Sequence, residues 1–451
     1  MARRAVVLAL ALAAVMPLLS GGVDTQQVRL LAAKFNVTCV LVFGDSSVDP
    51  GNNNYIATPM KGNFLPYGKD FFRGRPTGRF SNGRLATDFI AEALGYTKAI
   101  RPFLHKRLRP VDILHGVSFA SAASGYDELT ANLSNVLPLS QQLEYFREYK
   151  MRLRQIAGAR KAENIIKNAV AVLSMGTNDF LQNYYLEPIR PKQYTLEEYQ
   201  NYLASCMFDD VKTMHSLGIT RLVVVGVPAL GCMPLVKTLM NQATCVEKYN
   251  NLSSSFNSKL NVKLDIARKE LGMKVGYVDA YGTVRDAVNN PEKYGLIETS
   301  KGCCGTGTVE YGDTCKGMST CANASKYIFW DAVHPTERMY EIIAGEAVDC
   351  LRKQLMVEVD SDSRETIQCI KKVDARCTGN VLVVIIMELL RGIGRLFYHM
   401  CEFNTVADKS VTTMRGQPLG EVSFEELPHV VRDIVLTEEL IGSNIPEDPG
   451  G

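Results

Sequence analysis

Short runs of apolar, mostly β-branched residues alternate with stretches of helical periodicity, and this alternation constrains the fold more than any other feature. The runs span residues 38–43, 169–173, 221–225 and 274–278. Continuous apolar runs of this length are typical of strands that are covered on both faces. Apolar residues at helical spacing over 140–156, with Ser140 as the expected N-cap, and over 252–271 predict helices between the strands. The sequence therefore predicts an α/β fold whose parallel sheet carries helices on both sides.

The two ends of the chain differ from this pattern. Arg3 and Arg4 precede an apolar run, residues 5–19, that is shorter than the roughly 20 residues needed to span a bilayer. We therefore expect residues 1–22 to be a signal peptide, with a membrane anchor as the alternative, and no stable membrane span elsewhere. The α/β pattern predicts one domain at 38–352. Residues 353–451 form an unassigned C-terminal appendage, either genuine or joined to the chain by a gene-model fusion.

Cysteines and glycosylation sequons support a secreted protein, extracellular or in the endomembrane lumen. The chain has 12 cysteines, and disulfides persist in oxidising compartments. Two of the cysteines flank a loop and four cluster late in the chain, where a zinc site is the alternative to disulfides: Cys232 and Cys245, then Cys303, Cys304, Cys315 and Cys321. Four N-x-[ST] sequons predict glycosylation, at Asn36, Asn132, Asn251 and Asn323.

Charge and motifs exclude several classes of partner. The 50 basic and 48 acidic residues leave a net charge of +2, which argues against nucleic acid as a main partner. We find no H-E-x-x-H, Walker or G-x-G-x-x-G motif in the sequence. The sequence therefore predicts neither a metal nor an organic cofactor.

Polar residues follow two of the predicted strands at their carboxyl ends. Ser46 comes directly after the first strand, in Gly44-Asp-Ser-Ser47, and Asn178 follows the second. Carboxyl ends of parallel strands meet at one edge of a sheet, where reactive groups gather. Ser46 is thus a candidate nucleophile and Asn178 a candidate donor to an oxyanion, the alternatives being an ordinary turn and an Asx-turn or N-cap.

A serine nucleophile needs a base, and two of the six histidines carry an aspartate three residues upstream. One pair is Asp331 with His334, and the other is Asp112 with His115. A spacing of three lets one turn deliver an imidazole and the carboxylate that orients it. The spacing does not choose between the two pairs.

Four blocks of sequence, in order over about residues 40–350, resemble the plant-type GDSL esterase/lipases of the SGNH hydrolase superfamily: GDSSVDPGNNN, MGTND, GCCGTG and FWDAVHPT. The resemblance implies a flavodoxin-like three-layer α/β/α fold. It also implies that Ser46 is the nucleophile, that His334 is the general base and then acid, and that Asp331 orients His334.

The same resemblance implies an oxyanion hole made of the Ser46 N–H, a glycine N–H and the Asn178 side chain. Ala123 stands where relatives have that glycine, and alanine is costly if the position needs a positive φ. The expected function is a secreted serine esterase/lipase acting on acyl or acetyl esters of lipid, cuticle or cell wall through an acyl-enzyme. The alternatives are an acyltransferase on the same fold and, because of Ala123, a weakly active or non-catalytic binding protein.

Overall fold

The computed structural model describes residues 25–355, so the predicted signal peptide and the appendage from residue 356 onward lie outside the described residues. A parallel six-stranded sheet runs through the centre, in the order β2-β3-β1-β4-β5-β6. The strands are β1 (Val40–Gly44), β2 (Arg101–Pro102), β3 (Val117–Ser118), β4 (Val170–Ser174), β5 (Arg221–Val225) and β6 (Lys274–Val278). All four predicted strands are present, and the predicted α/β fold class is confirmed.

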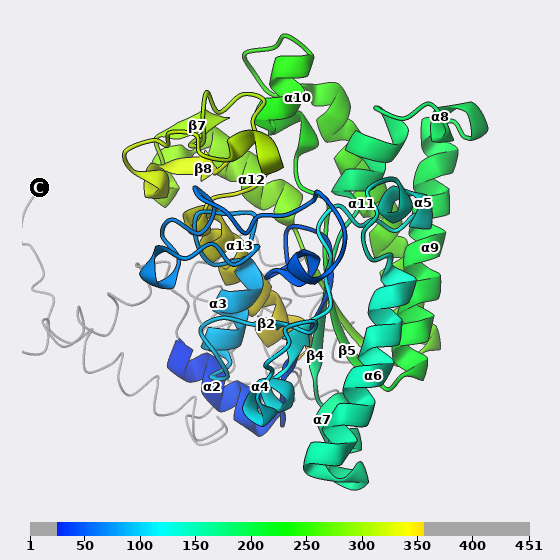
Figure 1. Ribbon diagram of the computed structural model, residues 1–451. Helices are drawn as coiled ribbons and strands as arrows, with labels where there is room; N and C mark the ends of the chain where they lie inside the picture. The colour runs from blue at the N-terminus through cyan, green and yellow to red at the C-terminus, as the bar shows by residue number, and fades with distance from the viewer. Residues whose placement is uncertain (1–24, 356–451) are drawn as a thin grey trace, which may run out of the picture. The chain divides into compact units, whose positions relative to one another are not determined.

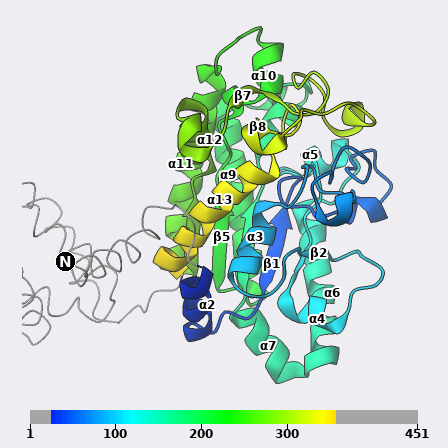
Figure 2. The ribbon, with the colours of Figure 1, turned by 90° about the vertical axis from the view of Figure 1, so that its left-hand side faces the viewer.

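Helices cover both faces of this sheet and make three layers. α2, α3 and α13 lie on one face, and α6, α9 and α11 lie on the other (Figures 1 and 2). The α-helices are α2 (Thr25–Lys34), α3 (Ala86–Ala93), α4 (Pro110–His115), α5 (Glu128–Leu133), α6 (Leu139–Ala157), α7 (Ala159–Lys167), α8 (Arg190–Gln193), α9 (Leu196–Ser216), α10 (Pro234–Leu239), α11 (Glu247–Glu270), α12 (Ala280–Asn289) and α13 (Glu337–Cys350). Short 3-10 or π segments are η1 (Asn52–Tyr55), η2 (Phe72–Gly74), η3 (Asp179–Tyr184), η4 (Leu230–Cys232), η5 (Pro291–Tyr294), η6 (Gly312–Cys315), η7 (Ala324–Lys326) and η8 (Leu351–Leu355).

The helix boundaries differ from the sequence prediction at two N-termini. The prediction of Ser140 as an N-cap is wrong, because α6 begins at Leu139 and its capping residue is Pro138. The Ser140 hydroxyl instead bonds the carboxylate of Glu128. α11 begins at Glu247, before the predicted start at residue 252. Its first turn places the buried Tyr249 among polar residues, so the apolar repeat does not mark where the helix begins.

The order of the strands determines where a site can form. Without the short edge strand β2, the order is that of a flavodoxin-like sheet, in which the chain first adds β3 on one side of β1 and then β4 on the other. Ligands bind outside the carboxyl ends of the strands at such a reversal point. Here the reversal lies between β1 and β4, directly before Ser46 and Asn178.

A second, two-stranded parallel sheet follows the main one, made of β7 (Glu298–Gly302) and β8 (Tyr327–Phe329). Three disulfides lie within residues 25–355: Cys232–Cys245, Cys303–Cys321 and Cys304–Cys315. The expected disulfides are therefore confirmed, and the four clustered thiols of the zinc alternative are consumed in them. Between residues 25 and 355, no helix has both the length and the apolar character that a bilayer crossing requires.

The buried core continues a little beyond the limits expected for the domain. Val28 and Ala32 of α2 are buried ahead of residue 38, and Leu355 is buried at the end of η8. These side chains join the same apolar core as the sheet. The layers beside the sheet therefore include residues from before and after the predicted span.

Candidate active site

The turn that carries Ser46 is held rigidly at the end of β1. Gly44 has a φ of +146°, and a Cβ there would lie 2.1 Å from the Ser174 carbonyl oxygen, so only glycine fits. The amide side chain of Gln142 accepts from the Gly44 N–H at 2.9 Å and donates to the Gly44 carbonyl at 3.0 Å. These contacts hold the backbone that presents Ser46.

Ser46, His334 and Asp331 form one hydrogen-bonded row. His334 Nε2 lies 2.9 Å from Ser46 Oγ, and His334 Nδ1 lies 2.8 Å from Asp331 Oδ2. Asp331 Oδ1 accepts from the backbone N–H groups of Val333 at 2.8 Å and His334 at 2.6 Å. One ring nitrogen of His334 thus contacts the carboxylate and the other contacts the serine hydroxyl, an arrangement in which an imidazole can accept a proton from a serine.

The other histidine pair does not form. Asp112 is bound by Arg109, with 2.7 Å between Arg109 Nη2 and Asp112 Oδ1. His115 ends α4, and its ring packs against Tyr96 with 5.6 Å between ring centroids. Of the two Asp/His pairs left open by their spacing, the structure brings His334 to Ser46.

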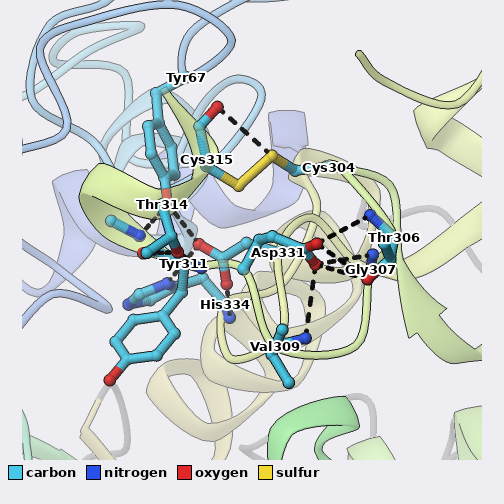
Figure 3. Close-up of a disulfide and its surroundings, with 12 residues drawn as sticks. Tyr67, Cys304, Thr306, Gly307, Val309, Tyr311, Thr314, Cys315, Asp331 and His334 are labelled. Carbon is cyan, nitrogen blue, oxygen red and sulfur yellow. Dashed lines mark hydrogen bonds and ion pairs between the residues drawn. A yellow bond between two sulfur atoms is a disulfide. The ribbon is translucent and has the colours of Figure 1, made fainter. Parts of the chain in front are cut away.

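Tyr67 is a further residue at this row that the sequence did not reveal. Its hydroxyl donates to Asp331 Oδ2 at 2.6 Å and accepts from the Gly312 N–H at 2.7 Å (Figure 3). Burial raises the pKa of Tyr67 well above its ordinary value, so the phenol stays protonated and donates a hydrogen bond to the carboxylate. Tyr67 and Asp331 are 264 residues apart, and no local pattern marks the pair.

The GCCGTG block, residues 302–307, packs against the backbone of Asp331 and Trp330. A Cβ at Gly302 would lie 2.6 Å from the Asp331 carbonyl oxygen, so glycine is needed for this approach. The carbonyl of Trp330 accepts from the N–H groups of Cys303 at 2.9 Å and Cys304 at 2.8 Å. The Cys304–Cys315 disulfide closes the loop that carries Gly312 (Figure 3).

Ala123 lies in a turn beside the row and has a φ of +69°. On one side of it, the Ala122 N–H donates to Asp49 Oδ2 at 3.1 Å. On the other, the Ser124 carbonyl accepts from Asn178 Nδ2 at 2.9 Å. The N–H groups of Ala123 and Ser46 have no hydrogen-bond acceptor among residues 25–355. Ala123 therefore has the positive φ that is unfavourable for alanine and that glycine adopts without strain.

Two buried carboxylates, Asp45 and Asp179, accept hydrogen bonds from the segments around Asn178. Burial raises the pKa of Asp45 to about 6, and its side chain accepts from the N–H and hydroxyl of Ser47. Burial raises the pKa of Asp179 to about 7, and that carboxylate accepts from the Tyr126 N–H at 2.8 Å and the Thr130 hydroxyl at 2.6 Å. Asp179 thereby holds the segment that follows Ala123.

Known proteins match this chain over the same region. Residues 40–347 match the family described as GDSL-like Lipase/Acylhydrolase. A GDSL esterase/lipase of Arabidopsis thaliana is 52% identical over 334 residues, which are 74% of this chain and 93% of that protein. The GDSL esterase/lipase APG of the same plant is 44% identical over 314 residues, covering 68% of this chain and 89% of that protein.

Among solved structures, a lipase from a goat rumen metagenome has a TM-score of 0.32 and 12% identity, covering 69% of this chain and 96% of its own. The family match covers more than half of the chain, and the similarity to plant GDSL esterase/lipases extends over most of it. The chain therefore belongs to the GDSL-like lipase/acylhydrolase family and is a serine ester hydrolase of that type.

Proposed function

We propose that this protein is a secreted esterase that hydrolyses carboxylic esters with Ser46 as nucleophile, His334 as general base and acid, and Asp331 as the group that orients His334. The observation that carries this proposal is the row of contacts from Ser46 Oγ through His334 to Asp331, at 2.9 and 2.8 Å. Both distances lie within hydrogen-bond reach, which is what proton transfer from the serine requires.

The reaction follows from these contacts. His334 Nε2 takes the proton from Ser46 Oγ as the oxygen bonds to the ester carbonyl carbon. The resulting oxyanion accepts hydrogen bonds from the N–H groups of Ser46 and Ala123 and from the Asn178 amide. When the intermediate collapses, His334 protonates the departing alcohol and leaves an acyl-serine. Water then attacks this ester with His334 again as base, which releases the acid and restores Ser46.

Two observations support a secreted, glycosylated protein. Three disulfides lie within the described domain, and such bonds persist in oxidising compartments. The asparagines of the four sequons are all exposed: Asn36, Asn132, Asn251 and Asn323. We propose that they carry N-linked glycans.

Covalent labelling tests the proposed nucleophile. A fluorophosphonate added to the purified glycoprotein is expected to modify Ser46, as read by mass spectrometry of the digested protein, and to stop hydrolysis of a chromogenic short-chain ester. Acceptor alcohols added to the same assay are expected to leave the free acid as the main product, which separates hydrolysis from acyl transfer. Labelling of another residue, or no turnover of any ester, would contradict the proposal.

Ala123→Gly tests whether the protein is instead a weakly active binder. We expect the free energy of unfolding to rise by up to about 1 kcal/mol, because glycine adopts a positive φ without the strain that alanine bears. We expect kcat/KM for a short ester to change less than about threefold, since alanine already presents the backbone N–H and an oxyanion donor acts only through its position. Denaturant unfolding and ester turnover measure both.

The neighbouring Ala122→Gly is the matched control. Ala122 is buried and is not among the positive-φ residues of the described chain, so glycine there gains nothing and increases the entropy of the unfolded chain. We expect this variant to be less stable than the parent. A hundredfold gain in activity on Ala123→Gly would favour the weakly active binding protein.

A further inference from the structure

An apolar pocket opens beside Ser46 and His334 and continues between the sheet and α13. Its cavity volume, the space that the centre of a water-sized molecule can occupy, is about 90 Å³, and Asn178 lines it together with Ser46 and His334. Its inner wall is made of aliphatic side chains from the sheet, α12 and α13: Val172, Val225, Val278, Val284, Ile343 and Ala347.

The pocket extends well into the layer beside the sheet. Ser174, Val225 and Val278 are paired across β4, β5 and β6 at the strand ends, and Val172 lies two residues deeper on the same face of β4 as Ser174. On α13, Tyr340 and Ala347 both line the pocket and are seven residues apart, which is about 10 Å along a helix. Figure 2 shows α13 and α3 crossing in front of the sheet.

The polar groups of the lining are concentrated at the mouth. The acidic or basic side chains that line the pocket are Asp45 and His334, both next to Ser46 in the site, and the phenol of Tyr340 also lies in the lining. The hydroxyls of Ser47 and Ser174 lie 2.8 Å apart and bond each other, and Ser47 also donates to Asp45. A substrate whose carbonyl lies at Ser46 thus meets polar groups at the reacting carbon and hydrocarbon beyond it.

We propose that this pocket binds the acyl chain of the substrate, so that the enzyme prefers straight acyl chains of medium length to acetyl groups. The inference rests on the proposed reaction at Ser46, which sets the ester carbonyl at the mouth. Hydrocarbon is the part of an ester that gains free energy by leaving water, and the aliphatic wall supplies the place for it.

Two series of esters separate the acyl side from the alcohol side. In the first, p-nitrophenyl acetate, butyrate, hexanoate, octanoate and palmitate vary the acyl chain; in the second, acetates of alcohols of increasing length vary the leaving group. We expect kcat/KM to rise by up to about fourfold per methylene along the first series until the pocket is full, since each buried methylene contributes a roughly constant amount. A rise along the alcohol series alone would overturn the proposal.

Two substitutions on α13 are expected to shift the preferred length in opposite directions. Ala347→Leu fills the pocket, so the ratio of octanoate to acetate kcat/KM is expected to fall at least tenfold. Ile343→Ala enlarges it, so the preferred chain is expected to lengthen. Ala344→Leu is the matched control, because Ala344 is buried on the same helix but does not line the pocket. We expect it to lower thermal stability and leave the octanoate-to-acetate ratio unchanged.

A binding measurement keeps the pocket testable apart from the reaction. Octanoate is expected to bind the Ser46→Ala protein in calorimetry, and Ala347→Leu added to that protein is expected to weaken binding at least tenfold. Such a result supports the pocket even if no ester is turned over, an outcome that would overturn the proposed function alone. Hydrolysis that depends on Ser46 but is equal for all acyl lengths would overturn the pocket and leave the reaction standing.

Discussion

Replacing Ser46 with alanine is expected to lower kcat for ester hydrolysis on the order of 10⁶-fold. A loss of this size is seen when the serine nucleophile is removed from a Ser-His-Asp arrangement. Without Oγ there is no atom that can bond to the carbonyl carbon, although the backbone donors remain. Initial rates with p-nitrophenyl butyrate measure the effect, with thermal unfolding to show that the variant is folded.

Ser47→Ala is the matched control for this variant. The Ser47 hydroxyl bonds Asp45 Oδ1 at 2.7 Å and Ser174 Oγ at 2.8 Å, and it makes no hydrogen bond to His334 within the described chain. We expect Ser47→Ala to keep activity within about tenfold of the parent, because a lost hydrogen bond of this kind costs only about 1 kcal/mol. Equal losses in the two variants would contradict Ser46 as the nucleophile.

Asp331→Asn is expected to reduce kcat about 10⁴-fold, since an amide in this place lets the imidazole adopt the wrong tautomer. The side chain of Asp331 accepts hydrogen bonds from two backbone N–H groups, from the His334 ring and from the Tyr67 hydroxyl. All four partners donate, so the NH₂ of asparagine would face a donor whichever way it turned. Steady-state kinetics on the same ester measure the loss, and a loss below tenfold would contradict the role of Asp331.

Tyr67→Phe removes a single donor from the same carboxylate and gives a graded comparison. We expect a loss of about tenfold in kcat, consistent with one hydrogen bond to a charged group. We also expect the acid limb of the kcat/KM profile to move to higher pH, because a carboxylate with one donor fewer holds the protonated imidazole more strongly. A lower kcat with an unmoved acid limb would mean that Tyr67 only supports the loop around Gly312.

Local patterns were sufficient for four of the six strands of the main sheet and for the order of the polar residues along them. The predicted strands follow from continuous apolar runs, because a strand buried on both faces needs an apolar residue at every position. Ser46 and Asn178 were placed at one edge of the sheet because parallel strands share the direction in which they end. β2 and β3, with two residues each, and β7, which is largely exposed, carry no such pattern.

Other parts of the site depend on contacts between distant residues. Tyr67 reaches Asp331 across 264 positions, and the pairing of four clustered cysteines follows from how the loop folds rather than from their spacing. The acyl pocket joins side chains of the sheet, α12 and α13, each of which is only one more apolar position in its own element. A periodic pattern indicates which residues are buried. It does not indicate where the packed helices and strands leave a cavity between them.

The sequence by itself determined the parallel α/β architecture, Ser46 and Asn178 at strand ends, and two equivalent Asp/His pairs. Spacing alone does not choose between those pairs. The tertiary structure brings together the pair that the family resemblance implies, because Asp112 is bound by Arg109 whereas Asp331 lies against the His334 ring beside Ser46. The tertiary structure also gave Ala123 its positive φ, in a turn held by Asp49 and Asn178. Spacing along the chain limits which groups can share a turn, but the partner that a carboxylate binds depends on which donors the fold brings within hydrogen-bond distance.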